Sequence, residues 1–227
     1  MTELDEVITN SIKNFEKKFR QERLDSISEE SQEDNPYLYW PDTFWCESDM
    51  KYWIEAELFK SLDRDRYAIH TEVSIDKTIF DEDKIKELRR MINRRVSRKD
   101  RVRRSLRPDL GIFPTRDGNE QDSYALMEFT FDLNSRNTPF SDSRQPKRAL
   151  INALKKLEIE AISLQSAIEC EITGQGWIVF THELLYEFVS GDQEVRSSFN
   201  RIKNDCRNVK FNLIGTTYEE RAGAAGR

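Results

Sequence analysis

Two short apolar segments between residues 106 and 131 constrain the fold of this chain more than any other stretch. The first covers residues 106–113 and the second residues 124–131, and the loop 115–119 between them consists of polar and turn-forming residues. Gly and Asn in that loop tolerate positive φ, and the flanking segments carry β-forming residues. The pattern therefore predicts a β-hairpin.

Each arm of this hairpin carries one carboxylate, Asp109 near the start of the first arm and Glu128 late in the second. In an antiparallel pair the start of one strand lies opposite the end of the other, so both acids are expected at the same end of the hairpin. Hard cations prefer oxygen ligands and usually take one or two carboxylates, with water and phosphate completing the shell. The sequence therefore predicts that Asp109 and Glu128 reach one divalent cation.

The motif Arg107-Pro108-Asp109, followed by Glu128-Phe129-Thr130, resembles the signature of the PD-(D/E)xK nuclease superfamily. That signature has Pro-Asp on one strand and Asp/Glu-x-Lys on the next, and the chain departs from it at Thr130, which stands in place of the lysine. The resemblance implies a restriction-endonuclease-like core and Mg²⁺- or Mn²⁺-dependent hydrolysis of nucleic-acid phosphodiesters. It implies DNA more than RNA as substrate, and a restriction or phage-defence setting.

The resemblance implies three further site residues. Members often place a Glu on the helix before the first strand, which makes Glu55 a candidate catalytic residue, although Glu55 is equally expected as a solvated acid. Some members carry an acid on the first strand, so Glu72 is a candidate metal ligand or a plain exposed strand residue. Some supply the catalytic lysine from the helix after the hairpin, which favours Lys147, with Arg144 and Arg148 as rivals. Lys147 also fits a lysine whose aliphatic stem passes the edge of the core.

Apolar periodicity predicts the remaining elements. Helices are expected at residues 3–24, 49–62, 79–104, 146–168, 184–189 and 195–206, and strands at 67–75, 177–180 and 209–214. Together they indicate an α/β fold with a central mixed β-sheet flanked by helices. We expect an N-terminal helix and aromatic-rich linker over 1–46, a nuclease-like α/β domain over 47–215 with a basic helical insertion at about 79–105, and a flexible tail over 216–227.

The expected insertion is strongly basic although the whole chain has a net charge of −6. From Arg89 to Arg107 nearly every other residue is Arg or Lys, against a single acid, Asp100. Arg and Lys neutralise phosphates without reading base sequence, so we expect this element to contact nucleic acid. The alternative is pairing with the acidic N-terminal region or with an acidic partner. The candidate contact residues are Arg94, Arg95, Arg98, Lys99, Arg101, Arg103 and Arg104.

Composition narrows the class of protein. No apolar run approaches the roughly 20 residues that span a bilayer, and the polar, acidic N-terminus does not resemble a secretory signal. The three cysteines are far apart and lack metal-ligand spacing, which is typical of a cytoplasmic protein. Two other functions stay open: an inactive nuclease-like scaffold that binds nucleic acid or protein, and a purely protein-binding adaptor. The sequence also leaves open a homodimer or a larger complex.

Overall fold

The computed structural model describes residues 2–29, 44, 46–72, 82–95, 107–115, 124–132, 145–171 and 174–225. Its elements are α1 (Glu3–Glu29), α2 (Glu47–Ser61), β1 (Tyr67–Thr71), α4 (Glu82–Arg95), β2 (Leu110–Pro114), β3 (Tyr124–Asp132), α5 (Gln145–Glu171), β4 (Gly174–His182), α6 (Glu183–Gly191), α7 (Gln193–Asp205), β5 (Val209–Ile214) and α8 (Tyr218–Ala225).

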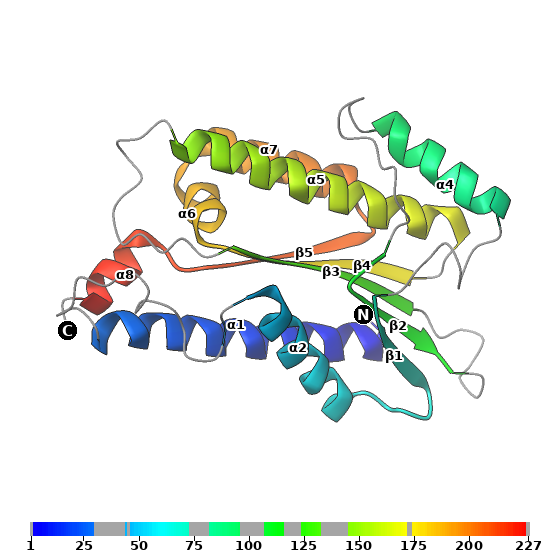
Figure 1. The fold of residues 1–227 in the computed structure, drawn as a ribbon, viewed down its shortest axis with the longest axis horizontal. Coiled ribbons are helices and arrows are strands. Elements are labelled where there is room, and N and C mark those ends of the chain that lie inside the picture. Colours follow the sequence, from blue (N-terminus) through cyan, green and yellow to red (C-terminus); the bar gives the residue numbers. More distant parts are fainter. Residues whose placement is uncertain are drawn as a thin grey trace.

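The five strands form one mixed sheet in the order β1-β2-β3-β4-β5 (Figure 1). Strands β1, β2 and β3 pair antiparallel, whereas β3, β4 and β5 pair parallel. Parallel neighbours need a long crossover. Helix α5 supplies it between β3 and β4, and α6 with α7 supplies it between β4 and β5. The predicted α/β class with a central mixed sheet is confirmed.

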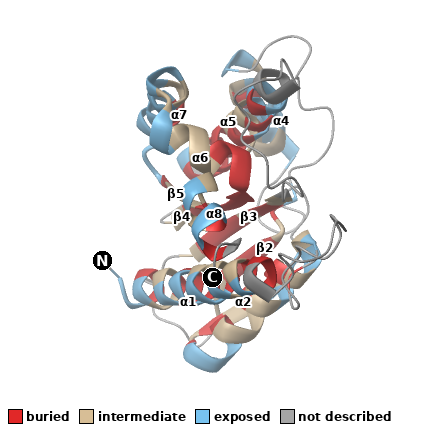
Figure 2. Cartoon of the chain, turned by 90° about the vertical axis from the view of Figure 1, so that its left-hand side faces the viewer, coloured by how far each residue is buried: buried red, intermediate tan, exposed pale blue. Residues whose placement is uncertain are grey.

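Helices cover both faces of the sheet. Helices α1 and α2 lie on one face, and α4, α5, α6 and α7 lie on the other (Figure 1). Along β3, Met127 and Phe129 join the core beneath α1 and α2, whereas Leu126 joins the core beneath α5. Figure 2 shows the buried residues concentrated between these layers. Since side chains alternate along a strand, Glu128 and Thr130 lie on the α5 face with Leu126.

Helix α1 packs on the body through an apolar stripe, as its helical spacing predicts. Phe15 and Phe19 on this stripe are fully buried, and Phe44 is buried beside them. The Phe44 ring lies 5.0 Å from Phe15 and 6.3 Å from Trp53, between centroids. Of residues 36–45 in the expected aromatic-rich linker, the structure describes only Phe44, which packs in the core.

The C-terminal stretch differs from the expected flexible tail, because residues 218–225 form helix α8. The Arg221 side chain is buried, and its guanidinium donates to the Thr216 carbonyl at 2.5 Å and to Glu187 at 3.1 Å. Glu183, also buried, accepts from Arg23 at 2.7 Å and from the Thr216 hydroxyl at 2.8 Å. The Ala- and Gly-rich composition concealed this anchor, which a single buried arginine supplies.

Two predicted elements extend beyond what the structure describes. The strand predicted at 67–75 is β1 up to Thr71, and residues 73–75 lie outside the described part. The helix predicted at 79–104 is α4 between Glu82 and Arg95, and its remaining residues lie outside as well. No helix among the described residues combines the length and apolar character needed to cross a bilayer.

Candidate functional site

Asp109, directly before β2, and Glu128, on β3, lie opposite each other on the two segments that correspond to the predicted signature. The β2–β3 register pairs Leu110 with Met127, and one step further along it Asp109 stands opposite Glu128. Both side chains lie on the α5 face of the sheet. The two carboxyl groups lie close enough to share a hydrogen bond when one of them is protonated. The shared end that the hairpin pattern predicts for these two acids is therefore present.

The site lies beside the first residue of β2, where β3 continues beyond its pairing with β2. Only residues 125–127 of β3 pair with β2, whereas all of β3 pairs with β4. Beyond Met127, the backbone N–H groups of β3 that point toward the β2 side donate to side chains, because no strand of the described chain pairs there. The Phe129 N–H donates to Asp109 Oδ2 at 2.8 Å, and the Phe131 N–H donates to the Glu47 carboxylate. Two acids thus cap the free edge of β3.

The Glu128 carboxyl group is desolvated by burial and has other acids close to it. Burial, and then the charges of Asp109 and Glu160, raise the pKa of Glu128 well above its usual value, and the hydrogen bond to Asp109 raises it further. Lys156 opposes this shift. Burial and the neighbouring negative charges thus disfavour the ionised form of Glu128, and a cation bound beside the pair would oppose the same repulsion.

Helix α5 adds an acid and a lysine that the sequence prediction missed. Burial raises the pKa of Glu160 to about 7, with Lys156 lowering it and Asp109 and Glu47 raising it. The Lys156 ammonium lies 3.6 Å from Glu160 Oε1. The Thr130 hydroxyl, at the position of the signature lysine, donates to the same carboxylate over 3.4 Å. One signal was available, because Glu160 falls on the inward edge of the helix beside Ala161.

Helix α2 reaches the site from the opposite face of the sheet. The Lys51 ammonium lies 4.0 Å from Asp109 Oδ1, and Glu47 lies 4.0 Å from the Lys156 ammonium. Burial, then repulsion by Asp109, raises the pKa of Glu47. Glu47, Lys51 and the predicted Glu55 are spaced by one turn each along this helix. The charged groups near Asp109 thus come from the first two turns of α2, one and two turns before Glu55.

The other predicted site residues take different positions. Glu72 has an exposed side chain and a φ of 50°, and its backbone N–H donates to the Asp109 carbonyl at 2.9 Å. Its main chain therefore adjoins the acid pair while its side chain faces solvent. Lys147 lies in the first turn of α5, but its side chain falls outside the described residues, and Arg144 lies outside entirely.

The basic residues are only partly described. Arg94 and Arg95 close helix α4, which packs on α5 through Leu88 and Ile92. Arg95 donates to Glu169 at 3.0 Å, and Arg94 is exposed. The predicted contact residues Arg98, Lys99, Arg101, Arg103 and Arg104 lie outside the described part of the chain.

The donor set is suitable for a hard cation without forming a complete ligand cage. Asp109 and Glu128 supply the one or two carboxylates that Mg²⁺ commonly takes, and Glu160 and Glu47 add negative charge nearby. In the described ranges no three His, Cys, Asp or Glu side chains lie close enough to hold one ion together. The residues therefore fit an ion held by two carboxylates, with water completing its coordination.

Comparisons of the chain with protein-family models, with curated proteins and with solved structures found no match.

Proposed function

We propose that this protein is a metal-dependent nuclease that hydrolyses phosphodiester bonds, of DNA in preference to RNA. The observation that carries this proposal is the contact between Asp109 and Glu128, which the β2–β3 register sets opposite each other. Two neighbouring, partly buried carboxylates destabilise each other when both are ionised. A fold retains such a pair at a small cost when a cation neutralises it.

The order of elements supports the same proposal. Helix α2, strand β1, the β2–β3 pair, helix α5 and strand β4 follow one another as the resemblance to PD-(D/E)xK nucleases implies. Helix α4 is inserted between β1 and β2. The restriction-endonuclease-like core, with a nuclease domain over residues 47–215, is thus part of the proposal.

In this proposal Asp109 and Glu128 hold Mg²⁺ or Mn²⁺. The bound ion would lower the pKa of a water and neutralise charge on the phosphate. Lys156 lies beside Glu160 and Glu47 in the described part of α5, and we assign it the role for which the sequence suggested Lys147. Its ammonium holds Glu160 and Glu47 in place and favours an ionised group beside it. On α2, Glu47 takes the part suggested for Glu55.

In this proposal the basic C-terminal end of α4 contacts the nucleic acid. Arg94 is exposed at the end of a helix whose last turn is basic. Arginine neutralises backbone phosphate regardless of sequence, so this end contributes affinity without base specificity.

One observation favours a second function, an inactive nuclease-like scaffold that binds nucleic acid or a protein. Thr130 places a neutral hydroxyl where the resemblance expects a lysine, and that hydroxyl faces Glu160. A protein that had lost catalysis could keep the acids as a structural cap of the β3 edge.

A cleavage assay separates the two functions. Single- and double-stranded DNA and RNA are incubated with Mg²⁺ or Mn²⁺ and the wild type, Asp109→Asn, Glu128→Gln, Lys156→Ala or Lys147→Ala. Glu158→Gln is the matched control, because Glu158 lies on α5 two residues before Glu160 and pairs with Arg201 at 3.5 Å. The nuclease proposal expects cleavage that both acid variants abolish and the control retains. Equal background in every sample would contradict it.

A further inference from the structure

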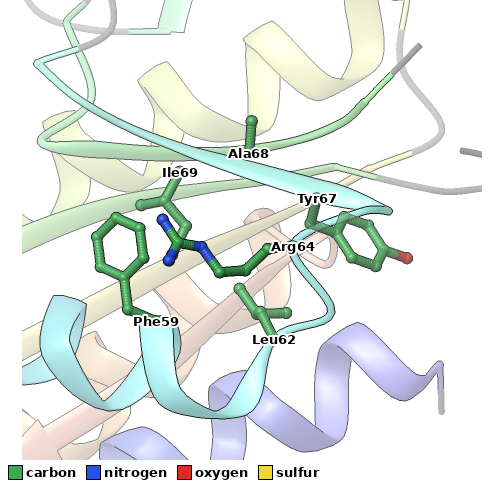
Figure 3. A pocket seen from close by; sticks show the side chains of 6 residues that line it. All are labelled: Phe59, Leu62, Arg64, Tyr67, Ala68 and Ile69. Carbon is green, nitrogen blue, oxygen red and sulfur yellow. The ribbon is translucent and has the colours of Figure 1, made fainter. Parts of the chain in front are cut away.

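A cavity of about 330 Å³ opens between the end of helix α2 and the edge strand β1, away from the acid pair (Figure 3). Its walls are Phe59, Leu62, Arg64, Tyr67, Ala68 and Ile69. The volume falls at the lower end of the roughly 300–1,000 Å³ typical of small-ligand sites. The cavity is lined by apolar side chains and polar groups together, and Figure 3 shows the Arg64 guanidinium between Phe59 and Ile69.

Arg64 is arranged to receive an anion. Its guanidinium carbon lies 5.1 Å from the centroid of the Phe59 ring. Within the part of the chain that the structure describes, Arg64 forms no ion pair. A guanidinium stacked on an aromatic face keeps its N–H edge available, and that fork matches the geometry of a phosphate.

A second exposed aromatic residue, Tyr52, lies on the same side of α2 as Phe59. Tyr52 is 75% exposed and Phe59 is 38% exposed, although most aromatic side chains of the described chain pack inside. The two residues stand two turns apart on one side of α2, about 10 Å along its axis. Lys51, which precedes Tyr52, lies 4.0 Å from Asp109. The aromatic positions thus lead along α2 from the acids to the cavity.

We propose that this surface of α2 binds an unpaired stretch of the substrate strand, with a base on Tyr52 and another nucleotide in the Phe59–Arg64 cavity. The inference rests on the proposed nuclease function and assigns its substrate class as single-stranded nucleic acid or a single-stranded flank. Exposed rings stack on any base whose face is free, whereas in a duplex each base face is covered by its neighbours.

The acids near α2 decide how the strand lies. Glu55 is on the same side of the helix as Tyr52 and Phe59, and it repels a phosphate placed over the helix. The bases therefore turn toward α2, and the phosphate next to the cavity reaches Arg64. Replacing Glu55 by Gln strengthens single-strand binding on this account.

The test is the binding of a fluorescent oligodeoxythymidylate and of a blunt hairpin duplex, measured by anisotropy in EDTA so that no strand is cut. Tyr52→Ala, Phe59→Ala and Arg64→Gln are each expected to weaken single-strand binding about ten-fold and to leave duplex binding nearly unchanged. Lys203→Gln is the matched control for Arg64, because the Lys203 ammonium also lies over a phenyl ring, 5.6 Å from that of Phe199, but on α7. Ile151→Ala, at a 55% exposed apolar residue of α5, controls for loss of surface area.

The binding and cleavage measurements together separate the single-strand inference from the nuclease proposal. Wild-type levels of single-strand binding in all three α2 variants, with thermal unfolding unchanged, would overturn the inference. So would equal losses on strand and duplex. Cleavage with Mn²⁺ is measured in parallel. If the wild type cuts and the α2 variants bind normally, this inference fails and the nuclease proposal stands. If the α2 variants lose single-strand binding but the wild type does not cut, the binding surface stands and the nuclease proposal fails.

Discussion

Asp109 and Glu128 face each other across β2 and β3, and the charge of Asp109 raises the pKa of Glu128. Asp109 also accepts the Phe129 N–H at 2.8 Å and lies 4.0 Å from the Lys51 ammonium. Asp109 thus caps the edge of β3, while its charge opposes ionisation of Glu128. This balance makes the pair sensitive to pH, to cations and to substitution.

Replacing Glu128 by Gln is expected to stabilise the metal-free protein at pH 8. Ionising Glu128 in the folded state is unfavourable because its pKa is raised, and Gln keeps the shape without the charge. We expect a gain of about 1–2 kcal/mol, or a Tm rise of about 2–8 °C. Mn²⁺ should raise the Tm of the wild type but not of this variant, because the substitution removes one of the two carboxylates of the proposed metal site. Glu158→Gln serves as the control, and a destabilised Glu128→Gln would contradict the account.

Stability should fall as pH rises from about 4.5 to about 7, in part because of Glu160. Its pKa is 4.5 when unperturbed and about 7 in the fold, so in this window the native state binds more protons than the unfolded state. The free energy of unfolding therefore decreases with pH, by up to about 3 kcal/mol for this group. Urea unfolding across pH 4–8 should show a shallower slope for Glu160→Gln. An identical slope in both proteins would show that Glu160 ionises normally.

Removing Lys156 should move the pH profile of the proposed reaction to higher pH. The Lys156 charge lowers the pKa values of Glu160, Glu47 and Glu128, so Lys156→Ala raises all three. We expect kcat to fall about 100-fold and the acidic limb of the profile to shift upward, with Lys156→Arg restoring much of both. Lys155→Ala, at the exposed neighbouring position, is the control. A loss of kcat without a shift of the limb would reject the electrostatic role.

Glu183 should be essential for the stability of the domain. It is fully buried and lies 2.7 Å from Arg23 and 3.8 Å from Arg221, both of which are also buried. Glu183→Gln would remove the carboxylate that contacts both buried guanidinium groups and leave Arg221 paired with Glu187, at a cost of about 3–5 kcal/mol in urea unfolding. Glu220→Gln breaks the partly exposed pair with Arg20 and should cost less than about 1 kcal/mol. Equal effects of the two variants would contradict this difference in burial.

Arg94 should contribute to nucleic-acid affinity through phosphate charge alone. Arg94→Gln is expected to weaken binding several-fold at low salt and to reduce the slope of log K against log salt concentration by about one. Stability should not change, because the side chain is exposed. Lys13→Gln, at an exposed position of α1 on the opposite face of the sheet, is the control. A salt slope identical to that of the wild type would remove α4 from the proposed binding surface.

The sequence by itself determined the elements and the hairpin that carries the two acids. Alternating apolar residues place strands, 3.6-residue spacing places helices, and both are local properties of the chain. The pairing of Asp109 with Glu128 followed from the same local logic, because a short hairpin has few registers. The final strand at Val209–Ile214 agrees with its predicted bounds for that reason.

Only the tertiary structure decided which helix residues meet the acid pair. Glu55 and Glu47 share one side of α2, so periodicity alone could not choose between them. The choice depends on where each helix crosses the sheet and how far it slides along its axis. Burial of side chains far apart in sequence fixes that position. The same reason explains α8, whose anchor is the meeting of Arg221 with Glu183 and Glu187.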